Sequence, residues 1–294
     1  LLLKKEDLLA DYHQKLIKSG VDIPQTNLLF EAGQFNSIYG DTRISLSQSI
    51  KFPSIYSRQK DVLKAQWENS IYDKSLRNNE IKNNISELFY YIIFLREKKK
   101  LLLEYDSLYS EFIKKTDLRL SLGESNVLEK KNALIQQGQI VSQIIEIEST
   151  LTAARSTFNW MLQTENLYEP QADFYTKILV PTDSILPQNH PLLLKQLHQE
   201  TIASAGIALE KAKLLPDFLL SYNNQSIQGT GADNITYNAG KRFNSVQAGI
   251  GIPISNTAQK ARVNAAKTEV LIAQNNTEIS KMELQNTIKN TRIS

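Results

Sequence analysis

The sequence contains the same succession of structural signals twice. Pro53 is followed six residues later by a Gln-Lys pair, and Pro253 is followed by a Gln-Lys pair at the same spacing. Upstream of these prolines, Leu16–Phe35 resembles Ala208–Ser226, and each stretch has a proline between a helical and an extended segment. Each copy therefore predicts the order helix, proline, strand, loop, strand, proline, helix. The order of these signals is matched throughout, which predicts two structural repeats.

Alternation of apolar and polar residues marks the strands of both copies. From Ile44 to Phe52 every second residue is apolar except Gln48, and the residues between them are polar. This period of two is typical of a strand with one apolar and one polar face. Each strand could extend over about nine or ten residues, which is the length of a tilted transmembrane strand.

The alternation assigns the strand residues to two faces. Residues predicted to face lipid are Phe30, Ile44, Leu46, Ile50, Leu220, Tyr222, Val246 and Ile250. Residues predicted to face a water-filled lumen are Glu31, Ser45, Ser47, Ser49, Asn223 and Gln247. A half-buried sheet in a soluble sandwich is the alternative, but two hairpins are too few for a sandwich. A sheet in lipid must close, so several chains would have to contribute strands to one barrel.

Long helices are predicted between the two strand pairs. No Gly or Pro occurs from Ser57 to Glu111, and only Gly138 occurs from Leu128 to Leu167. A helix of ~50 residues would be ~75 Å long, which is more than a normal domain accommodates. Apolar residues recur at spacings of three, four and seven, as in a coiled-coil seam. We expect this seam to contain Ile81, Ile85, Leu88, Ile92, Leu95 and Leu102 in the first helix, and Leu134, Val141, Ile144, Leu151, Phe158 and Met161 in the second.

The segment between these helices predicts the tip of an antiparallel hairpin. Gly123 is the only glycine there and can adopt the positive φ of a helix end. Ser125 is expected to cap the second helix, whose other end is expected to return to the level of the strands.

Composition and motifs exclude several classes of function. The formal net charge is +3 and dispersed, so nucleic-acid binding is not indicated. Cysteine is absent, and no run of apolar residues is long enough for a transmembrane helix. Three histidines, His13, His190 and His198, are too far apart in sequence to suggest one metal site. No catalytic constellation or cofactor motif is present, so we expect a protein that is not an enzyme and has no cofactor.

Three stretches resemble the family of TolC-like outer-membrane efflux ducts, and most closely its heavy-metal branch of the Czc and Cus type. They are Arg119–Leu134, Asn189–Ser226 and Phe243–Lys267. Arg119, Gly123 and Leu128 fit the family's tip pattern, whereas Asn126 replaces a serine. The resemblance implies a fold of mixed α and β structure, with long helical hairpins in an α-barrel and transmembrane β-hairpins in a trimeric twelve-stranded β-barrel.

The resemblance also implies a role and partners. The chain would be the passive outer-membrane duct of a tripartite efflux system in a Gram-negative bacterium, with its helices in the periplasm. Its partners would be a homotrimer of this chain, outer-membrane lipid, a periplasmic adaptor and an inner-membrane RND-type pump, and its substrates heavy-metal cations. The tip residues expected to dock on the adaptor are Arg119, Leu122, Gly123, Glu124 and Ser125. By this comparison the sequence lacks a signal peptide, the start of the first helix and most of a second helical hairpin.

The predicted segments follow the chain in order. They are 1–23, the end of a periplasmic helix; 24–53, the first β-hairpin; 54–168, the first helical hairpin with its tip at 119–125; 169–190, an equatorial linker; 191–215, a periplasmic helix; 216–253, the second β-hairpin; and 254–294, the start of a second helical hairpin. A periplasmic adaptor or coiled-coil scaffold is the alternative, but an adaptor should carry Gly-rich strand pairs that flank the hairpin. A soluble enzyme has no supporting motif.

Overall fold

A computed structural model describes residues 2–36, 38–164, 166–171 and 190–293. The chain divides into two units, Arg77–Ser184 and Leu2–Leu76 with Ile185–Ser294, which we describe separately. Helix α2 (Pro53–Ser121) runs through both of them. The equatorial linker predicted at 169–190 falls largely outside the described residues.

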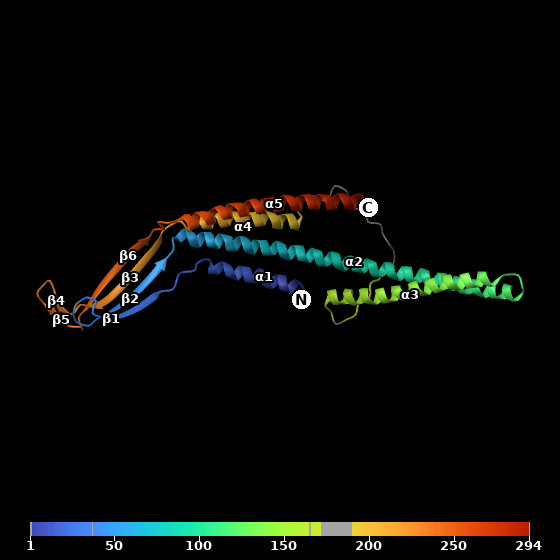
Figure 1. The fold of residues 1–294 in the computed structure, drawn as a ribbon, viewed down its shortest axis with the longest axis horizontal. Helices are drawn as coiled ribbons and strands as arrows, with labels where there is room; N and C mark the ends of the chain where they lie inside the picture. The colour runs from blue at the N-terminus through green and yellow to red at the C-terminus, as the bar shows by residue number, and fades with distance from the viewer. Residues whose placement is uncertain (1, 37, 165, 172–189, 294) are drawn as a thin grey trace. The chain divides into compact units, whose positions relative to one another are not determined.

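A four-stranded antiparallel sheet lies in the second unit (Figure 1). Its strand order is β1-β2-β3-β6, with bounds β1 (Asn27–Gly33), β2 (Asp41–Ile50), β3 (Asp217–Ser226) and β6 (Arg242–Gly251). Strands therefore form where the alternation predicts them. β1 has only 7 residues, however, which is fewer than the nine or ten expected. A small hairpin of β4 (Gly229–Thr230) and β5 (Thr236–Tyr237), which the sequence pattern does not predict, lies between β3 and β6.

The helices of this unit precede or follow the strands in the chain. They are α1 (Leu2–Leu16) with the 3-10 turn η1 (Ile17–Gly20), α4 (Pro191–Ala212) and α5 (Thr257–Ile293). α4 and α5 lie side by side (Figure 1). The buried side of α5 consists of small and β-branched residues at heptad-like spacing, namely Val263, Ala266, Ala273, Thr277 and Ser280. Such residues allow two helices to approach closely.

The N-terminal part of α2, up to Leu76, belongs to this same unit. Lys195 of α4 forms an ion pair of 2.6 Å with Asp73, and the rings of His198 and Tyr72 lie 4.6 Å apart. Where the strands meet the helices, the rings of Phe52 and Phe218 stack at 5.8 Å. This contact links the start of β3 to the residue that precedes α2.

The other unit is an antiparallel helical hairpin of α2 and α3 (Val127–Leu162). Its buried core contains Ile92, Leu95, Leu102, Ile147, Leu151, Ala154 and Phe158, with Ile85, Leu88, Ile140 and Ile144 packed against it. The seam on α3 therefore recurs at alternating spacings of four and three from residue 140 to residue 158, as in a coiled coil.

One expectation about this hairpin is wrong. Leu134 and Val141 are exposed, because the heptad register assigns Ile140, not Val141, to the seam. α3 has 36 residues and α2 has 69, so α3 is roughly half as long as α2.

None of the helices within the described ranges is long and apolar enough to cross a membrane.

Candidate functional site

The register of the sheet separates the predicted strand residues into two faces. Residues directly opposite each other in an antiparallel sheet share a face. One row of opposed residues crosses all four strands: Leu28, Leu46, Tyr222 and Val246. By this register, all eight residues predicted to face lipid lie on one face, which we call the apolar face, and all six predicted to face a lumen lie on the other, the polar face.

The apolar face is the more exposed one in this chain. Val246 is 78% exposed and Leu28 is 72% exposed, whereas Ser45, Ser47 and Asn223 of the polar face are only partly exposed. In water the hydrophobic effect favours the opposite arrangement. An exposed apolar surface of this kind is typical of a membrane or protein interface.

Hydrogen bonds and an ion pair connect residues across the polar face. Ser45 Oγ donates to Asn223 Oδ1 at 2.6 Å on the neighbouring strand. Arg43 donates to Gln225 at 2.9 Å and forms an ion pair of 3.0 Å with Glu31. The Arg43 guanidinium also lies 4.7 Å from the centre of the Phe35 ring. A polar, hydrogen-bonded face of this kind is compatible with water.

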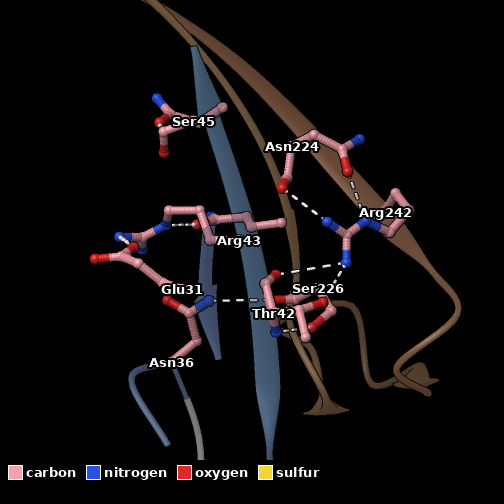
Figure 2. Close-up of polar contacts among 10 residues, drawn as sticks. Glu31, Asn36, Thr42, Arg43, Ser45, Asn224, Ser226 and Arg242 are labelled. Carbon is pink, nitrogen blue, oxygen red and sulfur yellow. Dashed lines mark hydrogen bonds and ion pairs between the residues drawn. The ribbon is translucent and has the colours of Figure 1, made fainter. Parts of the chain in front are cut away.

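At the end of the sheet next to the loops, polar residues replace apolar ones on the apolar face as well. Figure 2 shows the Arg242 guanidinium between Asn224 and Thr42. It donates to Asn224 Oδ1 at 2.6 Å, to the Asn224 carbonyl at 2.8 Å and to Thr42 Oγ1 at 2.7 Å. The Ser226 hydroxyl accepts from the Thr42 backbone N–H at 2.9 Å. These contacts connect β2, β3 and β6, and so join the two hairpins.

Asp41 is a buried member of the same group of polar residues. It is 1% exposed, and its carboxylate accepts hydrogen bonds from the Ser226 hydroxyl at 2.8 Å and the Gln228 backbone N–H at 2.9 Å. The Asn36 side chain also donates to the Ser226 carbonyl at 3.0 Å. None of these residues is among the site residues predicted from the sequence. One sequence signal could have identified them: Thr42, Asn224, Ser226 and Arg242 are polar at positions where the alternation would have apolar residues.

The hairpin tip has the backbone pattern of a Schellman motif. Gly123 has a φ of +76°, and its N–H donates to the Leu120 carbonyl at 3.1 Å. The Glu124 N–H donates to the Arg119 carbonyl at 2.8 Å. Both bonds satisfy carbonyls at the end of α2, and the positive φ explains why a glycine is needed there.

The cap of α3 differs from the expected one. Asn126, not Ser125, is the N-cap, because its side chain accepts from the Glu129 N–H at 3.1 Å. The Ser125 hydroxyl instead donates to the Glu129 carboxylate, and that carboxylate forms an ion pair of 3.4 Å with Arg119. The asparagine that departs from the family pattern is therefore the residue that begins the helix.

The tip exposes a group of apolar side chains. Leu122 is 64% exposed, and Leu118, Val127 and Leu128 around it are exposed as well. Of these four residues, only Leu122 is among the tip residues predicted from the sequence to dock on the adaptor. The arrangement is a small apolar surface at the end of a long helical hairpin.

The histidines do not form a site with one another. The His190 side chain caps α4 by accepting from the Leu192 N–H at 3.2 Å. Within the described residues, no three His, Asp or Glu side chains are grouped so that they could hold a metal ion.

Comparison with known proteins identifies the fold. No protein-family model matches the sequence, and no curated protein matches it. Among solved structures, CusC is 16% identical with a TM-score of 0.73 over 98% of this chain and 70% of its own. The CmeC outer membrane channel of Campylobacter jejuni is 15% identical with a TM-score of 0.76, over 96% of this chain and 65% of its own. The outer membrane protein VceC of Vibrio cholerae is 10% identical with a TM-score of 0.74, over 99% of this chain and 73% of its own.

The fold is that of TolC-like outer-membrane efflux channels. The comparison does not single out the heavy-metal branch, since CusC, CmeC and VceC match about equally well. The chain spans 65–73% of the length of these three channels.

Proposed function

We propose that this chain belongs to the outer-membrane duct of a tripartite efflux system. The observation that carries the proposal is the sheet, whose apolar face is exposed and whose polar face is hydrogen-bonded. In the outer membrane of a Gram-negative bacterium, acyl chains would cover the apolar face. The polar face would line a water-filled lumen, and the helices would extend into the periplasm. The matched solved structures are outer-membrane channels, which favours a duct over an adaptor or scaffold.

The duct would be a homotrimer with a twelve-stranded barrel. Among the described strands of the sheet, β1 and β6 each have a strand on one side only. Unpaired edges are not tolerated in hydrocarbon, so these edges must pair with other chains. The two strand pairs with their flanking prolines and helices would be the structural repeats, and three chains would supply four strands each.

Transport through the duct would be passive. Substrates would be delivered by an inner-membrane RND-type pump through a periplasmic adaptor, and a lumen of mixed polarity would let them leave without tight binding. The proposal that the substrates are heavy-metal cations rests on the resemblance of the tip and the two proline-containing stretches to the Czc and Cus branch. A strain that lacks the protein should become more sensitive to heavy-metal salts. If the strain becomes more sensitive to organic drugs alone, the proposed metal substrates are contradicted but the proposed duct is not.

Docking on the adaptor would involve the apolar tip around Leu122. In Leu122→Trp, folding and trimer formation should be retained, because the residue is exposed and lies outside the packed seam. Cross-linking to the adaptor and export should both decrease. If both remain at the level of the wild type, the tip does not dock there.

Cysteine cross-linking of the full-length protein tests the assembly directly, because this sequence has no cysteine of its own. In variants that carry one cysteine in β1 and one in β6, disulfides should form between chains for one register of the two strands. The matched control is the pair Ser47→Cys and Ser221→Cys, which lie directly opposite each other and should cross-link within one chain. Edge strands that never cross-link between chains in membranes would overturn the barrel and the duct.

A further inference from the structure

The edge strands of the sheet differ from its inner strands in the exposure of equivalent residues. In the row that crosses all four strands, the edge residues Leu28 and Val246 are 72% and 78% exposed. The inner residues of the same row, Leu46 and Tyr222, are 45% and 44% exposed. A further strand on each edge would therefore bring the edge residues toward the exposure of the inner ones. β6 is antiparallel to β1 across the sheet, so β6 of one chain and β1 of another can pair in the same antiparallel pattern.

The sequence repeat shows how far one hairpin is displaced along the strands from the next. Leu28 follows Pro24 by four residues. Tyr222 lies in the same row of the sheet and follows Pro216 by six residues. Because the two prolines occupy equivalent places in the repeat, the step from the first hairpin to the second moves the row two residues further from the proline.

The same step can be applied at the boundary between two chains. From the second hairpin of one chain to the first hairpin of the next, it leads eight residues beyond Pro24, to Ala32. Val246 of β6 lies opposite Tyr222, so it would lie opposite Ala32 of the next chain. In this register every residue of β1 would lie opposite one of residues 245–251 of β6.

The geometry of a closed barrel agrees with this displacement. Two residues per hairpin, taken around the six hairpins of the proposed trimer, amount to roughly 41 Å along the strands. Twelve strands that are about 4.8 Å apart measure roughly 58 Å across, so the strands would tilt by about 35°. A register shifted by two residues in either direction would give a tilt of about 20° or about 47°, whereas transmembrane barrels have tilts of about 35–45°.

The residues that this register brings together are complementary in size. Phe30 of β1 would lie opposite Ala248 of β6, and Leu29 would lie opposite Gly249. Side chains directly opposite each other in an antiparallel pair are in contact. Each bulky side chain would therefore extend over a small one on the neighbouring chain.

We propose that β6 of one chain pairs with β1 of a second copy in the register that places Ile250 opposite Leu28 and Gln247 opposite Glu31. The inference rests on the proposed function, to which it adds the residues that meet at each boundary between chains. On the apolar face, Ile250 and Leu28 would cover each other. On the polar face, the Gln247 amide would donate to the Glu31 carboxylate, which already forms an ion pair with Arg43.

Disulfide cross-linking of the full-length protein tests this register. Leu28→Cys combined with Ile250→Cys should convert most of the protein to a covalent trimer, because the Cα atoms of opposed residues lie within the roughly 7 Å that a disulfide spans. The matched control combines Leu28→Cys with Val246→Cys. Val246 lies on the same face about 14 Å along β6 from Ile250, so this variant should remain monomeric on a denaturing gel without reducing agent.

A second pair of cysteines tests the same register from the polar face. Glu31→Cys combined with Gln247→Cys should also give the covalent trimer, and reducing agent should return it to monomer. Cross-links between chains that form only at other combinations of β1 and β6 positions overturn the register and leave the duct intact. Edge strands that cross-link at no combination overturn both the register and the duct.

Discussion

The sheet and the α2–α3 hairpin place their apolar residues in opposite ways. In the hairpin, Ile92 has an exposure of 0% and the apolar seam lies between the helices. In the sheet, Leu28 and Val246 are among the most exposed side chains, and the residues joined by hydrogen bonds are polar. The hairpin follows the rule for a protein in water. The sheet has the pattern expected of a transmembrane barrel, whose outer face meets hydrocarbon and whose inner face meets water, and this pattern supports the proposed duct.

The largest effect is expected in the seam of the hairpin. Leu102 is 8% exposed and its neighbour Leu101 is 48% exposed. Leu102→Ala should cost about 2–5 kcal/mol of unfolding free energy, because it leaves a cavity between α2 and α3. Leu101→Ala should cost clearly less. Chemical denaturation of the two variants measures the difference, and equal losses would mean that the seam is not the buried surface of α2.

The second prediction compares an arginine placed on the apolar face of the sheet with one placed on the polar face. Leu46→Arg should cost about 2–4 kcal/mol if the residue lies near the bilayer midplane, because a cation is poorly solvated by acyl chains. Ser47→Arg, on the opposite face, should be tolerated for folding but change the flux through the lumen. Folding into lipid vesicles under denaturant measures both. Equal destabilisation by the two changes would indicate a soluble core on both sides.

The sequence predicts the strands and their faces well, because a period of two leaves little freedom. One residue of slip would move Leu46 to the polar face, so the alternation determines the register of a strand even though single residues, such as Gln48 and Leu219, depart from it. The sequence does not predict which residues join the two hairpins. Thr42, Asn224 and Arg242 come together only because β2 pairs with β3, and a long-range pairing of this kind has no local signal.

The buried seam of α3 is less predictable from the sequence than the strands are. Apolar residues are frequent on α3, and a list of spacings fits more than one stripe. Packing against α2 selects the stripe with Ile140, Ile147 and Ala154 and leaves Leu134 and Val141 exposed. The tip is an intermediate case: its glycine follows from backbone sterics, whereas the choice between Ser125 and Asn126 as the cap depends on where α3 begins.

A smaller effect is expected at that cap. Asn126→Ala should cost about 1 kcal/mol, because the Glu129 N–H loses its acceptor at the start of α3. Ser125→Ala should have a smaller effect, since the Ser125 hydroxyl contacts the Glu129 side chain and not the backbone. Denaturation of both variants under the same conditions ranks them. A larger loss for Ser125→Ala would restore Ser125 as the cap.

The smallest predicted effect concerns the contact between α4 and α5 and its dependence on pH. Burial raises the pKa of Glu210. Hydrogen bonds from Lys213 and Gln259, together with the positive charges of Lys213 and Arg262, lower the pKa by more, so it lies below its usual value. Gln259 on α5 donates to the Glu210 carboxylate at 2.7 Å and to the Glu210 carbonyl at 2.8 Å. A carboxyl group with a lowered pKa in the folded state stabilises the fold at pH values above its unfolded pKa of 4.5. This stabilisation is lost as the pH falls through the folded pKa.

Glu210→Gln should therefore be slightly less stable than the wild type at neutral pH, and the difference should decrease in acid. A difference that stays constant from neutral to acidic pH would show that the carboxylate charge does not contribute to the α4–α5 contact.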